Sequence, residues 1–218
     1  MKMKLVAGIM CGLLTLGMAG ASAANANLVV NGSFEDGDYT GANWSWKTLY
    51  AGDTSLTGWD IGGVGVDWHS PAEFSPIMFG EKALDLNLNG VTDSGILSQS
   101  FATDPGEWYT LKFYMAAPGQ FDASREVKVD VAGVEKTFSM PSAYNLGLTW
   151  EEFSLNFLAA DVNTRLAFSS ASGAYWGPVL DNVSVDHAVV TPEPASVVLF
   201  SLGGAAMAFA RRRMKTNA

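Results

Sequence analysis

Apolar and polar side chains alternate with a period of two along most of this 218-residue chain. In the stretch Tyr109–Met115, every second residue is Tyr, Leu, Phe or Met, and Thr, Lys and Tyr fill the positions between them. This pattern is typical of a β-strand with one face buried and the other in water. The same alternation occurs in residues 84–88, 127–131, 153–157, 166–168 and 183–185.

Turn-forming residues separate these segments. Pro105-Gly106 is one example, and both residue types favour the backbone angles of tight turns. Between the two ends of the chain, no segment shows the period of 3.6 that an amphipathic helix requires. About ten short strands within residues 24–190 predict a single all-β domain, either a sandwich or a barrel.

The N-terminus has the three parts of a secretory signal peptide. Lys2 and Lys4 form a positive start, Leu5–Met18 is an apolar run, and Ala21–Ala23 is a small-x-small cleavage site. We therefore expect residues 1–23 to be removed on export.

The C-terminus has a different tripartite pattern. A Pro-Glu-Pro signal is followed by the apolar run 195–210 and a basic stop at 211–215. Sixteen residues of helix span roughly 24 Å, which is short of the ~30 Å hydrocarbon core of a bilayer. The run therefore predicts a transmembrane helix that is a marginal, transient anchor, with a permanent anchor as the alternative. The residues that define the signal are Pro192, Glu193, Pro194, Arg211, Arg212 and Arg213.

This C-terminal pattern resembles the PEP-CTERM tail of exported proteins in Gram-negative bacteria. The resemblance covers about 25 residues and implies processing by an exosortase-type enzyme. It also implies transient residence in the inner membrane and a final location at the cell surface or in an exopolysaccharide matrix. On this basis the chain divides into a signal peptide (1–23), a β-domain (24–190) and a sorting tail (191–218).

Removing both ends changes the composition of what remains. The only cysteine, Cys11, leaves with the signal peptide, so the exported domain has no disulfide and depends on core burial, a metal ion or both. The formal charge of -9 becomes -14, because seven basic residues then face 21 acidic ones. Nucleic acid and anionic membrane surfaces are therefore excluded as preferred partners. Divalent cations and neutral glycans remain plausible.

Six segments of the domain form a recognisable order: Asn27–Glu35, Gly58-Trp59, Ala83–Asn87, Gly95–Phe101, Pro105–Tyr109 and Gly177–Val185. With these segments, the domain resembles the choice-of-anchor C domains of bacteria and the galactose-binding-like domains of some plant cell-wall proteins. This resemblance implies a two-layer antiparallel β-sandwich of jelly-roll type, and several such relatives bind carbohydrate.

A structural calcium site follows from the same resemblance. In similar sugar-binding modules, a glutamate of the opening motif and an aspartate of the closing motif ligate Ca²⁺, which prefers six to eight oxygen ligands. Residue by residue, this implicates Glu35 and Asp181, with a backbone carbonyl near Ser33. The alternative is that Glu35 is an exposed loop acid and Asp181 a turn-former.

Aromatic residues cluster in two polar loops. Flat sugar rings stack on indole and phenol rings that have an apolar body and a polar edge. The candidate sugar-binding residues are Trp44, Trp46, Tyr50, Tyr175 and Trp176. In the alternative reading, these rings cap one end of the domain. Three other tryptophans flank strands and are expected in the core, namely Trp59, Trp108 and Trp150.

Catalytic signatures are few. The two histidines are expected in a surface loop (His69) and in the tether before the tail (His187), and neither accompanies a nucleophile motif. Glycoside hydrolysis needs only two carboxylates, but Glu151 and Glu152 are adjacent in a strand and point to opposite faces.

We therefore expect a non-enzymatic exported protein that binds or organises exopolysaccharide or a cell-wall glycan. One alternative is a passive structural or adhesive surface protein without a sugar site. The other is a glycan-active hydrolase.

Overall fold

The computed structural model describes residues 27–40, 42, 45–72, 75–88, 93–119, 124–142, 148–173 and 176–188. The predicted signal peptide and the predicted membrane helix 195–210 lie outside these residues. Among the described residues, no helix has the length and apolarity needed to cross a membrane.

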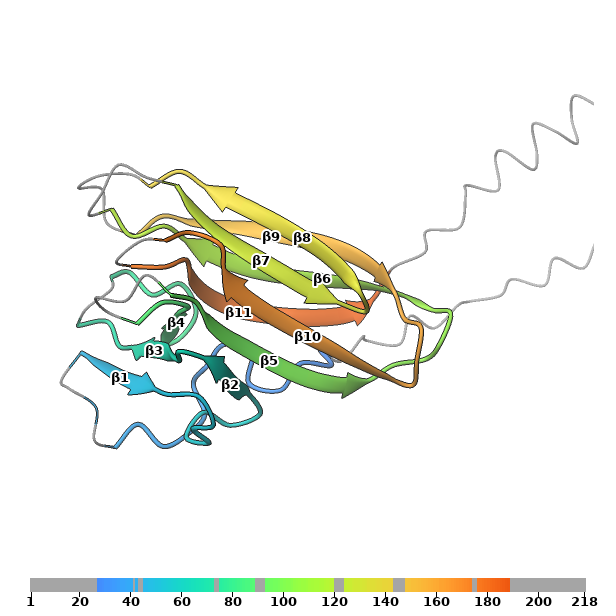
Figure 1. Cartoon of the computed structure of the whole chain (residues 1–218), viewed down its shortest axis with the longest axis horizontal. Coiled ribbons are helices and arrows are strands. Elements are labelled where there is room, and N and C mark those ends of the chain that lie inside the picture. Colours follow the sequence, from blue (N-terminus) through green and yellow to red (C-terminus); the bar gives the residue numbers. More distant parts are fainter. Residues whose placement is uncertain are drawn as a thin grey trace, which may run out of the picture.

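The described chain forms two antiparallel sheets that face each other (Figure 1). The six-stranded sheet has the order β1 (Trp46–Leu49), β3 (Val66–His69), β4 (Ala83–Asp85), β11 (Val179–His187), β6 (Trp108–Ala116), β9 (Trp150–Leu158). The five-stranded sheet has the order β2 (Asp60–Gly63), β5 (Gly95–Ala102), β10 (Asn163–Ser170), β7 (Arg125–Val131), β8 (Val134–Met140). This arrangement confirms the predicted two-layer β-sandwich.

The core lies between the inner faces of the two sheets. Phe113 of β6 packs edge-on against Phe168 of β10, with ring centroids 5.3 Å apart. Trp68 of β3 is fully buried and donates an indole hydrogen bond of 2.9 Å to the carbonyl oxygen of Phe34. Burial of large apolar side chains is the main favourable term in folding. It therefore stabilises this exported domain without a disulfide.

The opening and closing motifs of the domain lie side by side. The amide of Leu28 donates to the carbonyl oxygen of Val185, and the amide of Val183 donates to that of Gly32. A Cβ added at Gly32 would collide with the Val183 carbonyl oxygen, so this close approach requires glycine. The two motifs that carry the sequence resemblance thus form one structural unit.

The outer face of the six-stranded sheet is the face that turns away from the five-stranded sheet. Strand alternation places Leu49, Trp68 and Leu84 in the core and their neighbours on this outer face. One row of outer-face residues crosses the whole sheet in register. It consists of Thr48, Asp67, Asp85, Val179, Ala116 and Trp150.

Residues 75–82 cover part of this outer face and are called the covering segment below. The carbonyl oxygen of Pro76 accepts a 2.8 Å hydrogen bond from the Trp150 indole. The Phe79 ring packs on Tyr114 with a centroid distance of 4.8 Å. The covering segment therefore shields from water several outer-face residues of β6, β9 and β11.

The three tryptophans expected in the core differ in their surroundings. Trp59 is buried, as predicted, and packs near Phe34. Trp150 is only partly buried beneath the covering segment. Trp108 is 51% exposed, so its predicted burial is wrong. It is the first residue of β6, and the inward position there belongs to Tyr109.

Candidate functional site

Two of the predicted sugar-binding aromatics lie in the edge strand β1 or directly after it. Trp46 is partly exposed, and its ring centroid lies 6.4 Å from that of His69 on the neighbouring strand β3. Tyr50, immediately after β1, is 64% exposed. Because Leu49 points into the core, alternation within β1 places the Trp46 ring on the outer face of the sheet, beside His69.

Trp176 packs over the central strands of the same outer face. It packs, together with Trp150, against a small buried cluster that includes Val179 and Leu148. It therefore has more packing partners than the aromatic residues of β1. Trp44 and Tyr175, the other two candidates, lie outside the described residues.

A pair of buried aspartates lies between these two aromatic groups. Asp67 of β3 and Asp85 of β4 are direct cross-strand partners, and each is 1% exposed. The Thr48 hydroxyl donates a 2.6 Å hydrogen bond to Asp67. The amides of Asn87 and Gly177 donate to Asp85 at 2.8 and 2.9 Å. The pair thus links β1, β3, β4 and the start of β11 by hydrogen bonds.

Burial controls the charge of this region. Desolvation raises the pKa of Asp85 to about 8, and the nearby Asp67 carboxylate adds to the rise. Two backbone amides and the buried Arg125 oppose it. Asp85 is therefore neutral at pH 7, and the pair carries less charge than its composition suggests.

His69 is not the surface-loop residue that the sequence predicts. It is the last residue of β3, is 2% exposed, and pairs in register with Ala83. Burial lowers its pKa to about 3, so the imidazole is neutral. The prediction that His187 lies in the tether before the tail is also wrong. His187 is the last residue of β11, and its ring contacts that of Tyr109.

Glu35 and Asp181, the two predicted calcium ligands, both contact the covering segment. Glu35 accepts hydrogen bonds of 2.8 Å from the amides of Glu81 and Lys82. Asp181 accepts one of 3.0 Å from the amide of Phe79. The fold thus brings two carboxylates from opposite ends of the domain to one short loop.

Burial and a neighbouring negative charge both act on Asp181. Asp181 is fully buried, and its pKa rises to about 7 because of desolvation, with a further contribution from the negative charge of Glu35. A bound cation would remove this repulsion. However, the described residues contain no group of three His, Cys, Asp or Glu suited to a metal ion. Further ligands would have to be carbonyl oxygens, such as that predicted near Ser33, or water, both of which Ca²⁺ accepts.

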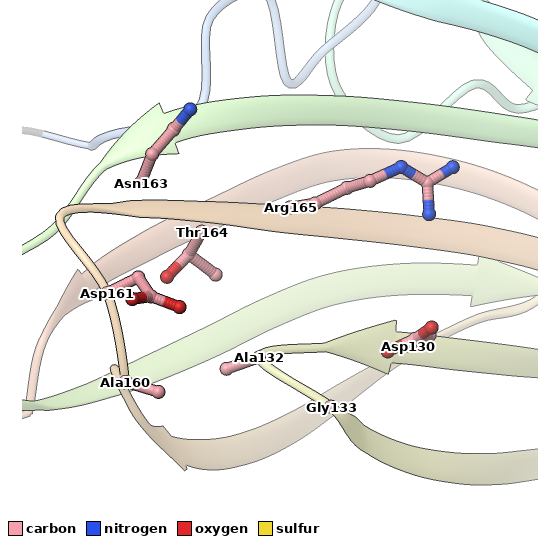
Figure 2. A pocket seen from close by; sticks show the side chains of 8 residues that line it. All are labelled: Asp130, Ala132, Gly133, Ala160, Asp161, Asn163, Thr164 and Arg165. Carbon is pink, nitrogen blue, oxygen red and sulfur yellow. The ribbon is translucent and has the colours of Figure 1, made fainter.

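Two shallow pockets occur elsewhere on the described surface, and neither contains a predicted sugar-binding residue. One, of about 370 Å³, lies against the loop 52–58 and the start of β2. The other, of about 440 Å³, lies between the β7–β8 turn and the start of β10 (Figure 2). Its lining is mostly polar and consists of Asp130, Ala132, Gly133, Ala160, Asp161, Asn163, Thr164 and Arg165.

The arrangement of carboxylates bears on hydrolytic chemistry. Glu151 and Glu152 are both exposed on β9, and Glu152 forms a 3.6 Å ion pair with Lys112. Asp67 and Asp85 face each other but are buried, so a polysaccharide cannot reach them in this conformation. On the outer face, these facing aspartates are therefore inaccessible, whereas Trp46 and Glu152 are at least partly exposed.

Sequence reasoning missed the buried aspartates and His69. The alternation of Asp85 with leucines predicts that it lies on the polar face of a strand, and in β4 it does point away from the core. Its burial was not predictable, because the Gly177 amide, which is distant in sequence, reaches it only in the folded chain. The one sequence signal for these residues is the alternation in Val66–His69, where Asp67 and His69 follow the apolar residues Val66 and Trp68.

Sequence comparison agrees with the fold and with the C-terminal motif. Residues 190–213 match the PEP-CTERM protein-sorting motif, which identifies an exported protein of Gram-negative bacteria with a membrane-anchored sorting signal. Residues 27–186 match a second family over nearly the whole β-sandwich. The chain therefore belongs to the family described as protein of unknown function (DUF642).

One curated relative is Halomucin of Haloquadratum walsbyi, 28% identical over 196 residues. The match covers 85% of this chain but spans only 2% of the length of that relative.

Several solved structures are similar in fold. TmCBM61, solved in complex with β-1,4-galactotriose, is 16% identical with a TM-score of 0.48, and the match covers 74% of this chain and 99% of that one. A family 35 carbohydrate-binding module from Clostridium thermocellum is 18% identical with a TM-score of 0.44, covering 66% and 99%. An exo-β-1,3-galactanase from Phanerochaete chrysosporium is 20% identical with a TM-score of 0.41, covering 65% and 29%.

Proposed function

We propose that the exported domain binds neutral glycans of the extracellular matrix and does not act on them as an enzyme. The observation that carries the proposal is the exposure of two aromatic rings at the edge strand β1, where Trp46 is partly exposed and Tyr50, the residue after the strand, is 64% exposed. Aromatic faces stack on the apolar face of a sugar, and adjacent polar groups bond its hydroxyls. Trp176 supplies a further, partly buried aromatic ring over the central strands of the same face.

Two further features support this proposal. The chain is exported by its sorting motif, so it meets glycans outside the cell. Its strong net negative charge disfavours polyanions as ligands. Exopolysaccharide of the producing bacterium and its cell-wall glycans are the ligands we expect, and an exosortase-type enzyme is the expected processing partner.

A calcium ion at Glu35 and Asp181 is part of the proposal. It would join the opening motif, the closing motif and the covering segment, and it would neutralise two neighbouring carboxylates. The proposed role is structural, because Glu35 and Asp181 both lie outside β1 and away from its exposed aromatic residues. Calcium would thus affect glycan binding only through the stability of the domain.

The test is glycan binding by the mature chain, from Ala24 onward, and by a Trp46→Ala, Tyr50→Ala double variant. We expect saturable binding to a neutral glycan array or to the producer's exopolysaccharide, weakened at least about ten-fold in the variant, which is ~1.4 kcal/mol. Trp108→Ala is the matched control, because it removes an exposed tryptophan far from β1. Trp108 is the first residue of β6, whereas β1 is in register with the last.

Other outcomes would point to the alternative functions. No binding by a folded wild-type chain would favour a passive structural or adhesive surface protein. Release of shortened glycan products would indicate a hydrolase. Equal affinity of the double variant and the wild type would place the sugar site away from β1.

A further inference from the structure

The described chain stops at one end of the sandwich, and this end is called the anchor end below. Ala188, the last described residue, donates a 2.8 Å hydrogen bond from its amide to the carbonyl oxygen of Trp108. The strands β9 and β11 both finish here, as their arrowheads show in Figure 1. The start of β6 and the position where the chain continues into the sorting tail are therefore adjacent.

Exposed apolar side chains gather at this same end. Trp108 is 51% exposed and lies opposite Leu158, which is 44% exposed, in the register of β6 and β9. Val162, in the turn after β9, is 71% exposed, the largest value among the large hydrophobic residues that are exposed in the described chain. Exposed apolar side chains gathered at one end of a protein indicate an interaction surface.

The length of the tether restricts what this surface can contact. The apolar run of the sorting motif begins at Ala195, seven residues after Ala188. Seven extended residues reach at most about 25 Å. While the run is in a bilayer, the anchor end must therefore lie within this distance of the lipid headgroups.

We propose that Trp108, Leu158 and Val162 contact the headgroup region of the membrane that holds the sorting tail. Tryptophan is enriched at this depth of a bilayer, because its ring is apolar and its N–H is polar. Tethering raises the effective concentration of the surface at the membrane, so a small apolar patch is sufficient. The domain would then stand with β6 directed away from the bilayer and the β1 aromatics at its outer end.

The charge of the anchor end specifies the lipid. Asp104, Glu107 and Asp161 are exposed around the apolar residues, and Arg165 is an exposed basic residue nearby. Anionic lipids attract basic segments and repel acidic ones. The surface therefore suits zwitterionic headgroups, and adding anionic lipid should weaken the contact.

The absence of cysteine from residues 24–218 makes a site-specific test possible. Val162→Cys and, as the control, Tyr50→Cys are labelled with an environment-sensitive fluorophore in the mature full chain. The chain is reconstituted in phosphatidylcholine vesicles that contain headgroup spin-labelled lipid. We expect the label at 162 to be quenched and its emission to shift to the blue, whereas the label at 50 keeps its emission in water.

Two further variants separate lipid contact from mere proximity. In the Val162→Cys background, Trp108→Asp should reduce quenching to the level at position 50, and Trp108→Phe should retain it. Replacing part of the phosphatidylcholine by phosphatidylglycerol should also reduce quenching. Circular dichroism checks that each variant is folded.

Equal quenching at positions 162 and 50 would overturn the proposal, as would a full chain that does not float with the vesicles. Unchanged quenching in a folded Trp108→Asp variant would also overturn it. The inference rests on the sorting tail and not on glycan binding. Failure here therefore leaves the proposed function intact, and failure of glycan binding leaves this inference intact.

Discussion

Asp85 shows how a single residue acquires its properties from the fold. Its neighbours in sequence are leucines, and its polar character suggests an exposed position. In the folded domain it is 1% exposed and accepts two backbone hydrogen bonds. The carboxyl group therefore keeps its proton, and burial makes its charge state a property of the tertiary structure.

This burial predicts a pH dependence of stability. The unfolded chain loses the Asp85 proton near pH 3.8, whereas the folded chain keeps it until about pH 8. The contribution of Asp85 to the free energy of unfolding is thus largest in acid and falls as the pH rises from about 4 to 8. The slope for one proton is at most about 1.4 kcal/mol per pH unit.

Asp85→Asn tests this prediction, because the amide remains neutral and its oxygen can still accept hydrogen bonds. We expect the variant to gain stability relative to the wild type as the pH rises from 4 to 8 in urea unfolding. His69 has the opposite effect between pH 6.5 and about 3, since burial lowers its pKa, but this contribution cancels in the comparison. Asp60→Asn, at an exposed position, is the control. Parallel curves for Asp85→Asn and the wild type would contradict the prediction.

At the scale of elements, the covering segment connects parts of the chain that are far apart in sequence. It reaches Glu35 near the start of the domain, Asp181 near its end, and Trp150 in β9. Its contacts with both carboxylates are through backbone amides. A calcium ion bound by these carboxylates would therefore also affect the conformation of this loop.

Calcium removal should accordingly lower the thermal midpoint of unfolding. At a calcium concentration 100 times the dissociation constant, binding stabilises the folded state by about 2.7 kcal/mol. For a domain of this size, that corresponds to a shift of roughly 5–10 °C. The measurement is a calorimetric melt with calcium and with EDTA, for the wild type and for Glu35→Gln.

The calcium proposal requires that Glu35→Gln lose its response to EDTA. Glu107→Gln, at an exposed carboxylate at the anchor end, is expected to respond as the wild type does. A wild-type midpoint that is identical in calcium and in EDTA would contradict the proposed site.

For the whole molecule, the decisive feature is the position of the last strand. β11 lies in the middle of the six-stranded sheet, between β4 and β6, and the N-terminal segment also bonds to it. The sheet therefore cannot be completed until nearly the entire domain is available. Such long-range pairing is typical of slowly folding β-proteins.

A truncation tests this dependence on β11. A chain that ends at Pro178 should show no cooperative unfolding transition in urea, because it lacks the central strand. A chain that ends at Val190 should unfold cooperatively. A cooperative transition in the shorter chain would show that the remaining strands form a stable sheet without β11.

The sequence alone determined the class of fold and the destination of the protein. Period-two alternation is a local property, so β6, β7, β9, β10 and β11 were predictable from consecutive residues. The short strands β1, β2 and β3 were not, because four residues are too few to show a period. The sorting motif was also readable, since it is contiguous in the chain.

Only the tertiary structure decided which residues share a surface. It brought Glu35 close to Asp181, paired Asp67 with Asp85 across two strands, and buried His69. It also exposed Trp108 beside the start of the tail. These outcomes depend on strand order and on loops that cross the sheet. Such contacts join residues distant in sequence, and no local pattern encodes them.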